Sequence, residues 1–134
     1  MIKSPEEFIN LRNSENSEDQ FRASNDFAEI QVWLNVIHDY PEYKVWVIKN
    51  KNIQIEILEY LSKDIEENVR SAVARKRKIN ENIFLRLSTD TNEDVRYALM
   101  CNTKLPIVKK IKIYVDDSNW LKTQLSKFID NASR

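Results

Sequence analysis

Residues 57–74 read ILEYLSKDIEENVRSAVA, and residues 83–100 read IFLRLSTDTNEDVRYALM. The two stretches carry Leu, Ser, Asp, Glu, Val, Arg and Ala at positions that lie 26 residues apart. The same spacing continues more weakly before them, at Tyr43, Lys44, Val47 and Asn50, and after them, at Ile113, Asp116, Leu121, Lys122 and Leu125. A fixed period of about 20 to 50 residues is typical of a solenoid, whose units bury their apolar faces against one another. We therefore expect about four 26-residue repeats.

The composition predicts an almost wholly helical chain. There is no glycine, and there are only three prolines. Glycine supplies the positive φ angles of tight β-hairpins and phosphate-binding loops. Its absence argues against a β-rich fold and excludes a P-loop and a dinucleotide-binding fingerprint. Each repeat should hold a first helix (53–62, 79–88 and 105–114), a turn at Asp64, Asp90 or Asp116, and a second helix (66–74, 92–100 and 118–129).

The first 40 residues do not share the clear repeat pattern and are expected to form an N-terminal helical cap. A capping box at Ser4 predicts a helix to about Leu11, and a short helix is expected over 18–24. A second capping box at Asp26 should open a helix that ends where Tyr40 precedes a proline. We predict a single domain with a cap (1–40), stacked repeats (41–130) and a polar tail (131–134).

The repeat unit resembles those of HEAT-like proteins and of the variant leucine-rich repeat, whose pattern is similar to Leu-Ala-x-Asp-x4-Val-Arg-x-x-Val-Ala-x-Asn-x-x-x-Pro. The matching residues are Asp64, Val69, Arg70, Val73 and Ala74 in one unit and Asp90, Val95, Arg96, Asn102 and Pro106 in the next. The resemblance extends from about Tyr43 to Leu125 and implies an all-α, right-handed superhelix of stacked helix pairs. Variant-repeat proteins can carry an iron–sulfur cluster on several cysteines. This chain has only Cys101, so we expect no such cluster and no other cofactor.

Other segments resemble small bacterial HEAT-like proteins, some of which sit beside secreted toxins as immunity proteins. The residues that carry this resemblance are Trp33-Leu34-x-Val36-Ile37, Tyr40-Pro41-x-x-x-Val45-Trp46-Val47 and Arg75-Lys76-Arg77-Lys78. The resemblance implies a bacterial protein that binds and neutralises a toxin domain.

An aspartate and a cation recur six residues apart, as Asp64/Arg70, Asp90/Arg96 and Asp116/Lys122. We interpret these pairs as a structural ladder, in which the aspartate caps a helix and the cation pairs with an aspartate of the same or the next unit. The alternative is a catalytic or anion-binding row. A carboxylate that is paired with a cation has a lowered pKa, however, and is a poor general base.

The histidine and cysteine content does not favour an enzyme or a metal site. His38 is the only histidine and Cys101 the only cysteine. One histidine excludes a histidine-based metal cluster, and we interpret Cys101 as a partly buried structural thiol near a helix end rather than a nucleophile. We therefore expect a non-enzymatic protein that holds no metal.

Charge is unevenly distributed along the chain, although the formal net charge is zero. Residues 1–40 carry eight acids and three bases, so residues 41–134 carry a net charge of +5. Four cations follow one another at residues 75–78, and the same corner between units in neighbouring repeats holds Lys49, Lys51, Lys78 and Lys104. We expect this basic ridge to bind an acidic protein surface.

Two alternatives to protein binding by the ridge stay open. The first is nucleic-acid binding of the kind seen in HEAT-like DNA glycosylases, which the zero net charge and the short repeat array disfavour. The second is a scaffold role in a larger complex.

Aromatic residues add further candidates for partner contacts. Trp46 aligns with Ala72 and Ala98, so its ring either fills a gap or is partly exposed as a binding anchor. Tyr97 aligns with Ser71, which is not a core position, and is a candidate exposed aromatic. Trp33 and Trp120 are expected in the core.

The expected compartment is the cytoplasm. The first residues lack the apolar segment of a secretory signal, and no apolar run is as long as a membrane span. A single cysteine cannot form an internal disulfide, which fits a reducing compartment. We expect no membrane partner.

Overall fold

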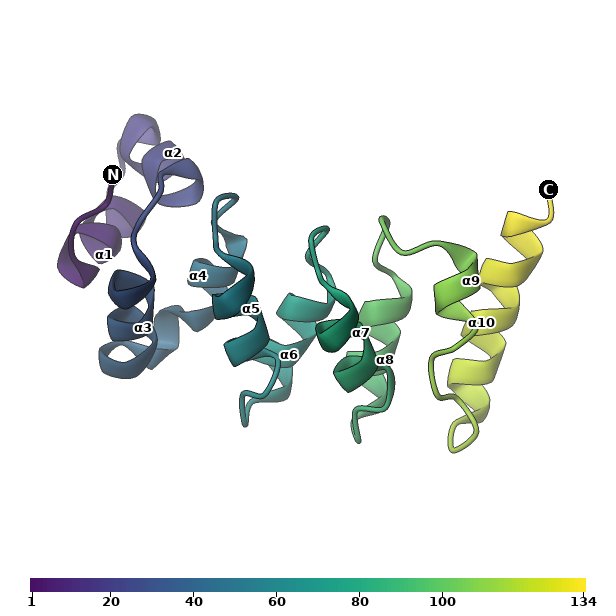
Figure 1. Ribbon diagram of the computed structural model, residues 1–134. Helices are drawn as coiled ribbons and strands as arrows, with labels where there is room; N and C mark the ends of the chain where they lie inside the picture. The colour runs from purple at the N-terminus through teal and green to yellow at the C-terminus, as the bar shows by residue number, and fades with distance from the viewer. The chain divides into compact units, whose positions relative to one another are not determined.

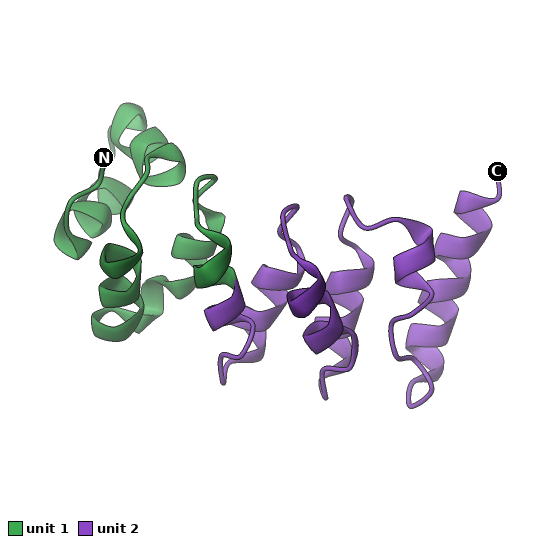
Figure 2. Ribbon diagram, in the orientation of Figure 1, with its two compact units in different colours: residues 1–58 green, residues 59–134 purple.

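The computed structural model describes residues 1–134 and is all-helical (Figure 1). It contains ten α-helices and one short 3-10 helix, and its only β-type pairing is an isolated bridge between Ile2 and Ala28. The all-α prediction is therefore confirmed. No residue adopts a positive φ angle, which agrees with a chain that has no glycine. The chain divides into two compact units, residues 1–58 and 59–134 (Figure 2), and the division falls within α5 (Ile55–Leu61).

Unit 1 packs its helices around Trp33. Its elements before α5 are α1 (Pro5–Asn13), α2 (Ser17–Asn25), α3 (Ile30–Asp39), the 3-10 helix (Pro41–Tyr43) and α4 (Lys44–Lys49). The Ser4 Oγ accepts a hydrogen bond from the Glu7 backbone N–H at 3.0 Å, so α1 begins as its sequence predicts. The Trp33 ring is fully buried and meets the Phe8 ring edge-on, with centroids 5.1 Å apart. Trp33 is therefore a core residue, as expected.

The capping box predicted at Asp26 is wrong. Helix α3 begins only at Ile30, and no side chain caps it. The Ile2 backbone N–H donates to the Phe27 carbonyl at 2.8 Å, which holds this part of the chain extended before the helix begins. Asp26 pairs with Arg22 at 3.0 Å instead.

Unit 2 arranges its helices in two rows (Figure 1). Helices α6 (Glu67–Ala74), α8 (Glu93–Met100) and α10 (Asn119–Ala132) form one row, and α7 (Glu81–Ser88) and α9 (Ile107–Lys110) form the other. Helix α8 lies at the centre and packs against α6, α7 and α10. Its core residues Val95 and Leu99 are equivalent to Val69 and Val73 of α6, and all four are buried. The repeated apolar positions therefore build the interface between neighbouring helices.

Helix α9 is shorter than the predicted helix over 105–114. Pro106 precedes its first residue, and the chain turns after Lys110. The Tyr114 backbone N–H then donates to the Ser88 carbonyl at 2.9 Å. This contact with the end of α7 draws the backbone out of a helical path, and it could not be seen in the local sequence.

Arginine–aspartate pairs join consecutive repeats of unit 2. Arg70 donates from Nε and Nη2 to the two carboxylate oxygens of Asp90, at 2.8 and 3.2 Å, and from Nη1 to the Asp64 carbonyl at 2.9 Å. The hydrogen bond to Asp90 raises the pKa of Arg70. The fully buried Arg96 donates to both carboxylate oxygens of Asp117, at 2.7 and 2.9 Å, and to the Tyr114 carbonyl at 2.7 Å.

The predicted third pair, Asp116/Lys122, is not part of this arrangement. Both residues are exposed, and Arg96 binds Asp117 instead of Asp116. Arg96 and Asp117 lie 21 positions apart, whereas Arg70 and Asp90 lie 20 apart. The segment between the arginine and its aspartate is therefore one residue longer in the repeat that contains the shortened α9. The strict 26-residue period therefore fails at this point.

The aspartates of the turns also do not cap the helices that follow. Asp64 and Asp90 accept hydrogen bonds from the backbone N–H groups two residues later, at 3.0 Å each. The helix cap of α8 is Asn92, whose Oδ1 accepts from the backbone N–H of Asp94 at 2.7 Å. Each aspartate thus stabilises its own turn, and Asp90 also binds Arg70 of the preceding repeat.

The Asp117 ion pair predicts a pH-dependent stability. Hydrogen bonds from Arg96 hold the pKa of Asp117 below its ordinary value of 3.8. Because the folded-state pKa is the lower one, the pair stabilises the fold above pH 3.8, and this contribution is lost as the pH falls through the folded-state pKa. Asp117→Asn should lower the urea midpoint of unfolding at neutral pH. In acid, the midpoint of this variant should fall less steeply with pH than that of the wild type. The exposed neighbour gives the control, since Asp116→Asn should match the wild type; equal effects would contradict the observed pairing.

Candidate functional site: the basic end of unit 2

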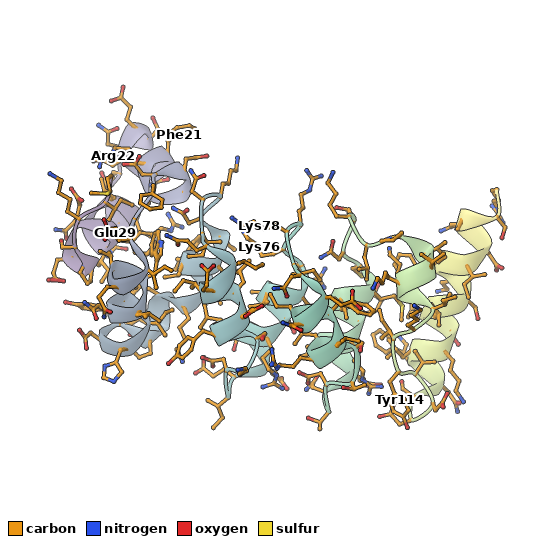
Figure 3. All side chains as sticks on the ribbon, in the orientation of Figure 1. Phe21, Arg22, Glu29, Lys76, Lys78 and Tyr114 are labelled. Carbon is orange, nitrogen blue, oxygen red and sulfur yellow. The ribbon has the colours of Figure 1, made fainter.

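The basic run of the sequence lies in the loop between α6 and α7. Arg75 follows the last residue of α6, and Arg75, Arg77 and Lys78 are exposed while Lys76 is half-buried. Lys104 is exposed in the loop between α8 and α9. The two loops lie at the same edge of unit 2, and Figure 3 places Lys76 and Lys78 toward that edge, with Tyr114 toward the opposite one. We call these residues the basic end: Arg75, Lys76, Arg77, Lys78 and Lys104.

A buried amide joins the two loops of the basic end. Asn102 is 2% exposed, and its Nδ2 donates to the carbonyls of Ala74 and Lys76, at 2.8 and 2.7 Å. Its Oδ1 accepts from the Lys104 backbone N–H at 3.0 Å. One side chain therefore fixes the backbone on both sides of Arg75 and the backbone at Lys104.

An equivalent amide occurs in unit 1. Asn50 is fully buried, its Nδ2 donates to the carbonyls of Ala23 and Asp26, and its Oδ1 accepts from the Asn52 backbone N–H. Asn50 and Asn102 lie 52 positions apart, which is twice the repeat period. Both residues match the repeat pattern in the sequence, but their role as loop clamps was not predicted. The sequence did contain one signal for this role, namely an asparagine that recurs at twice the repeat period.

The basic and acidic residues of unit 2 occupy different stretches of its sequence. Unit 2 carries 15 bases and 11 acids, and residues 68–80 and 95–115 each contain five bases and no acid. Arg70, Arg96 and Lys109 from these stretches are paired with Asp90, Asp117 and Glu81. Most acids of the unit lie in or beside the turns before α6, α8 and α10 (Asp64, Glu66, Glu67, Asp90, Glu93, Asp94, Asp116 and Asp117). The basic end therefore presents a concentrated positive potential.

Lys49 and Trp46 lie on α4 of unit 1. The Arg12 guanidinium carbon lies 3.4 Å from the centroid of the Trp46 ring, and the Lys49 ammonium lies 4.5 Å from it. Cations within about 6 Å of a ring centroid are attracted to its face. Trp46 is 36% exposed, but its ring carries two cations of its own chain, which leaves it poorly suited as an open binding anchor.

Tyr97 and Trp120 form a partly exposed aromatic pair on unit 2. Their ring centroids lie 4.9 Å apart, with the ring planes inclined at 52°. Trp120 is 42% exposed, so its predicted core placement is wrong; Leu121, the next residue of α10, is fully buried in its place. Tyr97 is half-buried, and the neighbouring Cys101 raises the pKa of the Tyr97 hydroxyl. The exposure expected at Tyr97 is therefore only partial, because its ring packs against Trp120.

The chain has one histidine and one cysteine. His38 is exposed, and its Nδ1 lies 3.2 Å from the Asp39 carboxylate. Cys101 is half-buried at the C-terminal cap of α8. No group of three or more His, Cys, Asp and Glu side chains is placed to hold a metal ion. None of the helices has the length and apolar character that crossing a membrane requires.

The function of this chain is inferred from its own side chains. Comparisons with protein-family models, with curated proteins and with solved structures found no match to this chain.

Proposed function

We propose that this chain is a non-enzymatic, HEAT-like repeat protein that binds another macromolecule through the basic end. The most specific form of the proposal is a bacterial, cytoplasmic immunity-type protein that neutralises a toxin domain. The observation that carries it is the cluster of cations in two neighbouring loops whose backbones are fixed by the buried Asn102.

The fixed loops support a binding role on energetic grounds. Ordering a flexible loop on association costs free energy, and a loop that is already ordered avoids most of that cost. The hydrogen bonds of Asn102 hold the backbone at Lys76 and Lys104 before any partner arrives. Exposed cations such as Arg77 and Lys104 then attract an acidic surface over a distance of about one Debye length, roughly 8–10 Å at physiological salt. An acidic toxin domain has the complementary charge.

A nucleic acid is the second candidate partner, because the same cations could contact phosphates. The charge balance of the chain argues against it. Unit 1 carries ten acids and six bases, so the +4 of unit 2 is matched by −4 elsewhere in the chain. A protein that binds a long phosphate backbone is expected to carry a net positive charge.

A charge-reversal pair tests the proposal. Arg77→Glu combined with Lys104→Glu changes two exposed side chains of the basic end, and Lys63→Glu combined with Lys122→Glu makes the same charge change at exposed sites elsewhere in unit 2. The probe is the protein encoded by the adjacent open reading frame. Its association rate, measured by surface plasmon resonance, should fall by about tenfold or more in the first variant, because steering depends on these charges. The second variant should stay within about twofold of the wild type.

Two results would contradict the proposal in different ways. If the adjacent gene product is not toxic in cells that lack this chain, the immunity reading is wrong. If a fluorescein-labelled DNA duplex binds the wild type with a steep salt dependence, and the Arg77/Lys104 reversal abolishes this binding, the chain is a nucleic-acid-binding protein.

A further inference from the structure

The row of helices α6, α8 and α10 carries an exposed arginine, a half-buried tyrosine and an exposed tryptophan. Arg75 lies at the end of α6, Tyr97 lies on α8, and Trp120 lies on α10. These are the residue types that contribute most to binding energy in protein interfaces. Arg75 also belongs to the basic end.

The repeat period brings these three residues to the same face. Arg75 and Cys101 lie 26 positions apart, at equivalent ends of α6 and α8. Tyr97 lies one turn before Cys101. Helix α6 packs against α8, so Arg75 lies at the end of the helix beside the one that carries Tyr97. Trp120 reaches the same ring from α10, with 4.9 Å between the ring centroids.

The position of Trp120 leaves a large apolar surface in contact with solvent. The interior position of this part of α10 is filled by Leu121, and Trp120 remains 42% exposed. Burying apolar surface is favourable by about 25 cal/mol per Å². A side chain that covers the pair would therefore gain free energy without a change in the fold.

We infer that this face binds an extended segment of a partner protein that has an aromatic or aliphatic side chain flanked by carboxylates. The apolar side chain lies on the Tyr97–Trp120 pair, and a carboxylate accepts paired hydrogen bonds from the Arg75 guanidinium. The inference rests on the proposed function and names the contact that gives it specificity. The charges of the basic end provide fast association, and the aromatic pair provides slow dissociation.

A nucleic acid fits this face less well than an acidic peptide. Stacking of successive bases requires separate, open ring faces, whereas the two rings here pack against each other at an inclination of 52°. Asp94 is exposed on α8, three residues before Tyr97. Its carboxylate would repel a phosphate backbone that ran along this helix, while a peptide can place a neutral or basic residue there.

A phage-displayed library of random dodecapeptides tests the inference with the purified full chain as bait. Selected peptides should carry an aromatic or aliphatic residue beside acidic ones. Trp120→Ala should weaken an enriched peptide by about 30-fold, the effect of a strong interface residue, and Arg75→Gln by about tenfold. Ile129→Ala removes a comparably exposed apolar side chain from the same helix and should leave the affinity unchanged. Thermal melts identify any variant that loses its fold, and Trp120→Phe should recover most of the affinity.

The outcomes separate this inference from the proposed function. Peptide binding that is lost in the Arg77/Lys104 reversal but unchanged in Trp120→Ala overturns the aromatic contact and leaves the basic end as the binding surface. A library without acidic, apolar-anchored peptides overturns the inference, as does tight binding of single-stranded oligothymidylate that Trp120→Ala abolishes.

Discussion

Asp90→Ala is expected to lower the free energy of unfolding by about 3–5 kcal/mol, because it removes one partner of a buried ion pair. The Asp90 side chain is 7% exposed and the Arg70 side chain is 17% exposed. The substitution leaves the Arg70 guanidinium with only the carbonyls of Asp64 and Ile65, and it leaves the Asn92 backbone N–H without its acceptor. Thermal and urea unfolding followed by circular dichroism measure the loss, with the thermal midpoint falling by about 10 °C or more.

Three further variants identify the cause of this loss. Asp94→Ala removes an exposed aspartate of the same repeat and should change stability by less than about 0.5 kcal/mol. Asp90→Asn keeps an acceptor for the Asn92 N–H and should fall between the wild type and Asp90→Ala. Adding Arg70→Met to Asp90→Ala should restore part of the stability, because no unpaired charge is then left in the protein interior. Strictly additive losses would show that Arg70 and Asp90 do not stabilise one another.

The helices of unit 2 could be predicted closely because their signals are local. Helices α6, α7, α8 and α10 each begin and end within three residues of the predicted bounds. Their apolar positions recur with the period: the equivalent residues Val69, Val95 and Leu121 are all buried, whereas Leu125, the counterpart of Leu99, is half-buried. Helix α9 and the Arg96 partner were mispredicted for a shared reason. The Tyr114 hydrogen bond to the end of α7 is a contact between distant residues, and it alters both the helix length and the residue spacing.

The charges of the candidate site could also be predicted, but its organisation could not. Four consecutive cations are plain in the sequence, whereas the clamp formed by Asn102 depends on how two loops approach each other. The same limit applies to Trp120. Both Trp120 and Leu121 fit an apolar helix position, and only the packing of α10 against α8 decides which of the two is buried.

Asn102→Ala is expected to cost about 2–4 kcal/mol of unfolding free energy, because three hydrogen bonds of a buried side chain are lost together. The carbonyls of Ala74 and Lys76 lose their donor, and the Lys104 backbone N–H loses its acceptor. Urea unfolding measures the cost. Asn82→Ala is the matched control, because Asn82 is an exposed asparagine of the same unit and its replacement should be nearly neutral.

If Asn102 holds the two loops together, its loss should also have a local effect that a purely stabilising residue would not produce. Hydrogen exchange of the Lys104 amide should accelerate in Asn102→Ala by more than the global loss of stability explains, because its acceptor is removed locally. Asn102→Asp keeps that acceptor but places a carboxylate against the carbonyls of Ala74 and Lys76. The pKa of the introduced aspartate should therefore rise above its value in the unfolded chain. Its penalty should therefore be largest at neutral pH and shrink as acid protonates the carboxyl group, opposite in sign to the acid effect expected of the Asp117 pair. An Asn102→Asp variant with the pH profile of the wild type would show that this amide does not join the two basic loops.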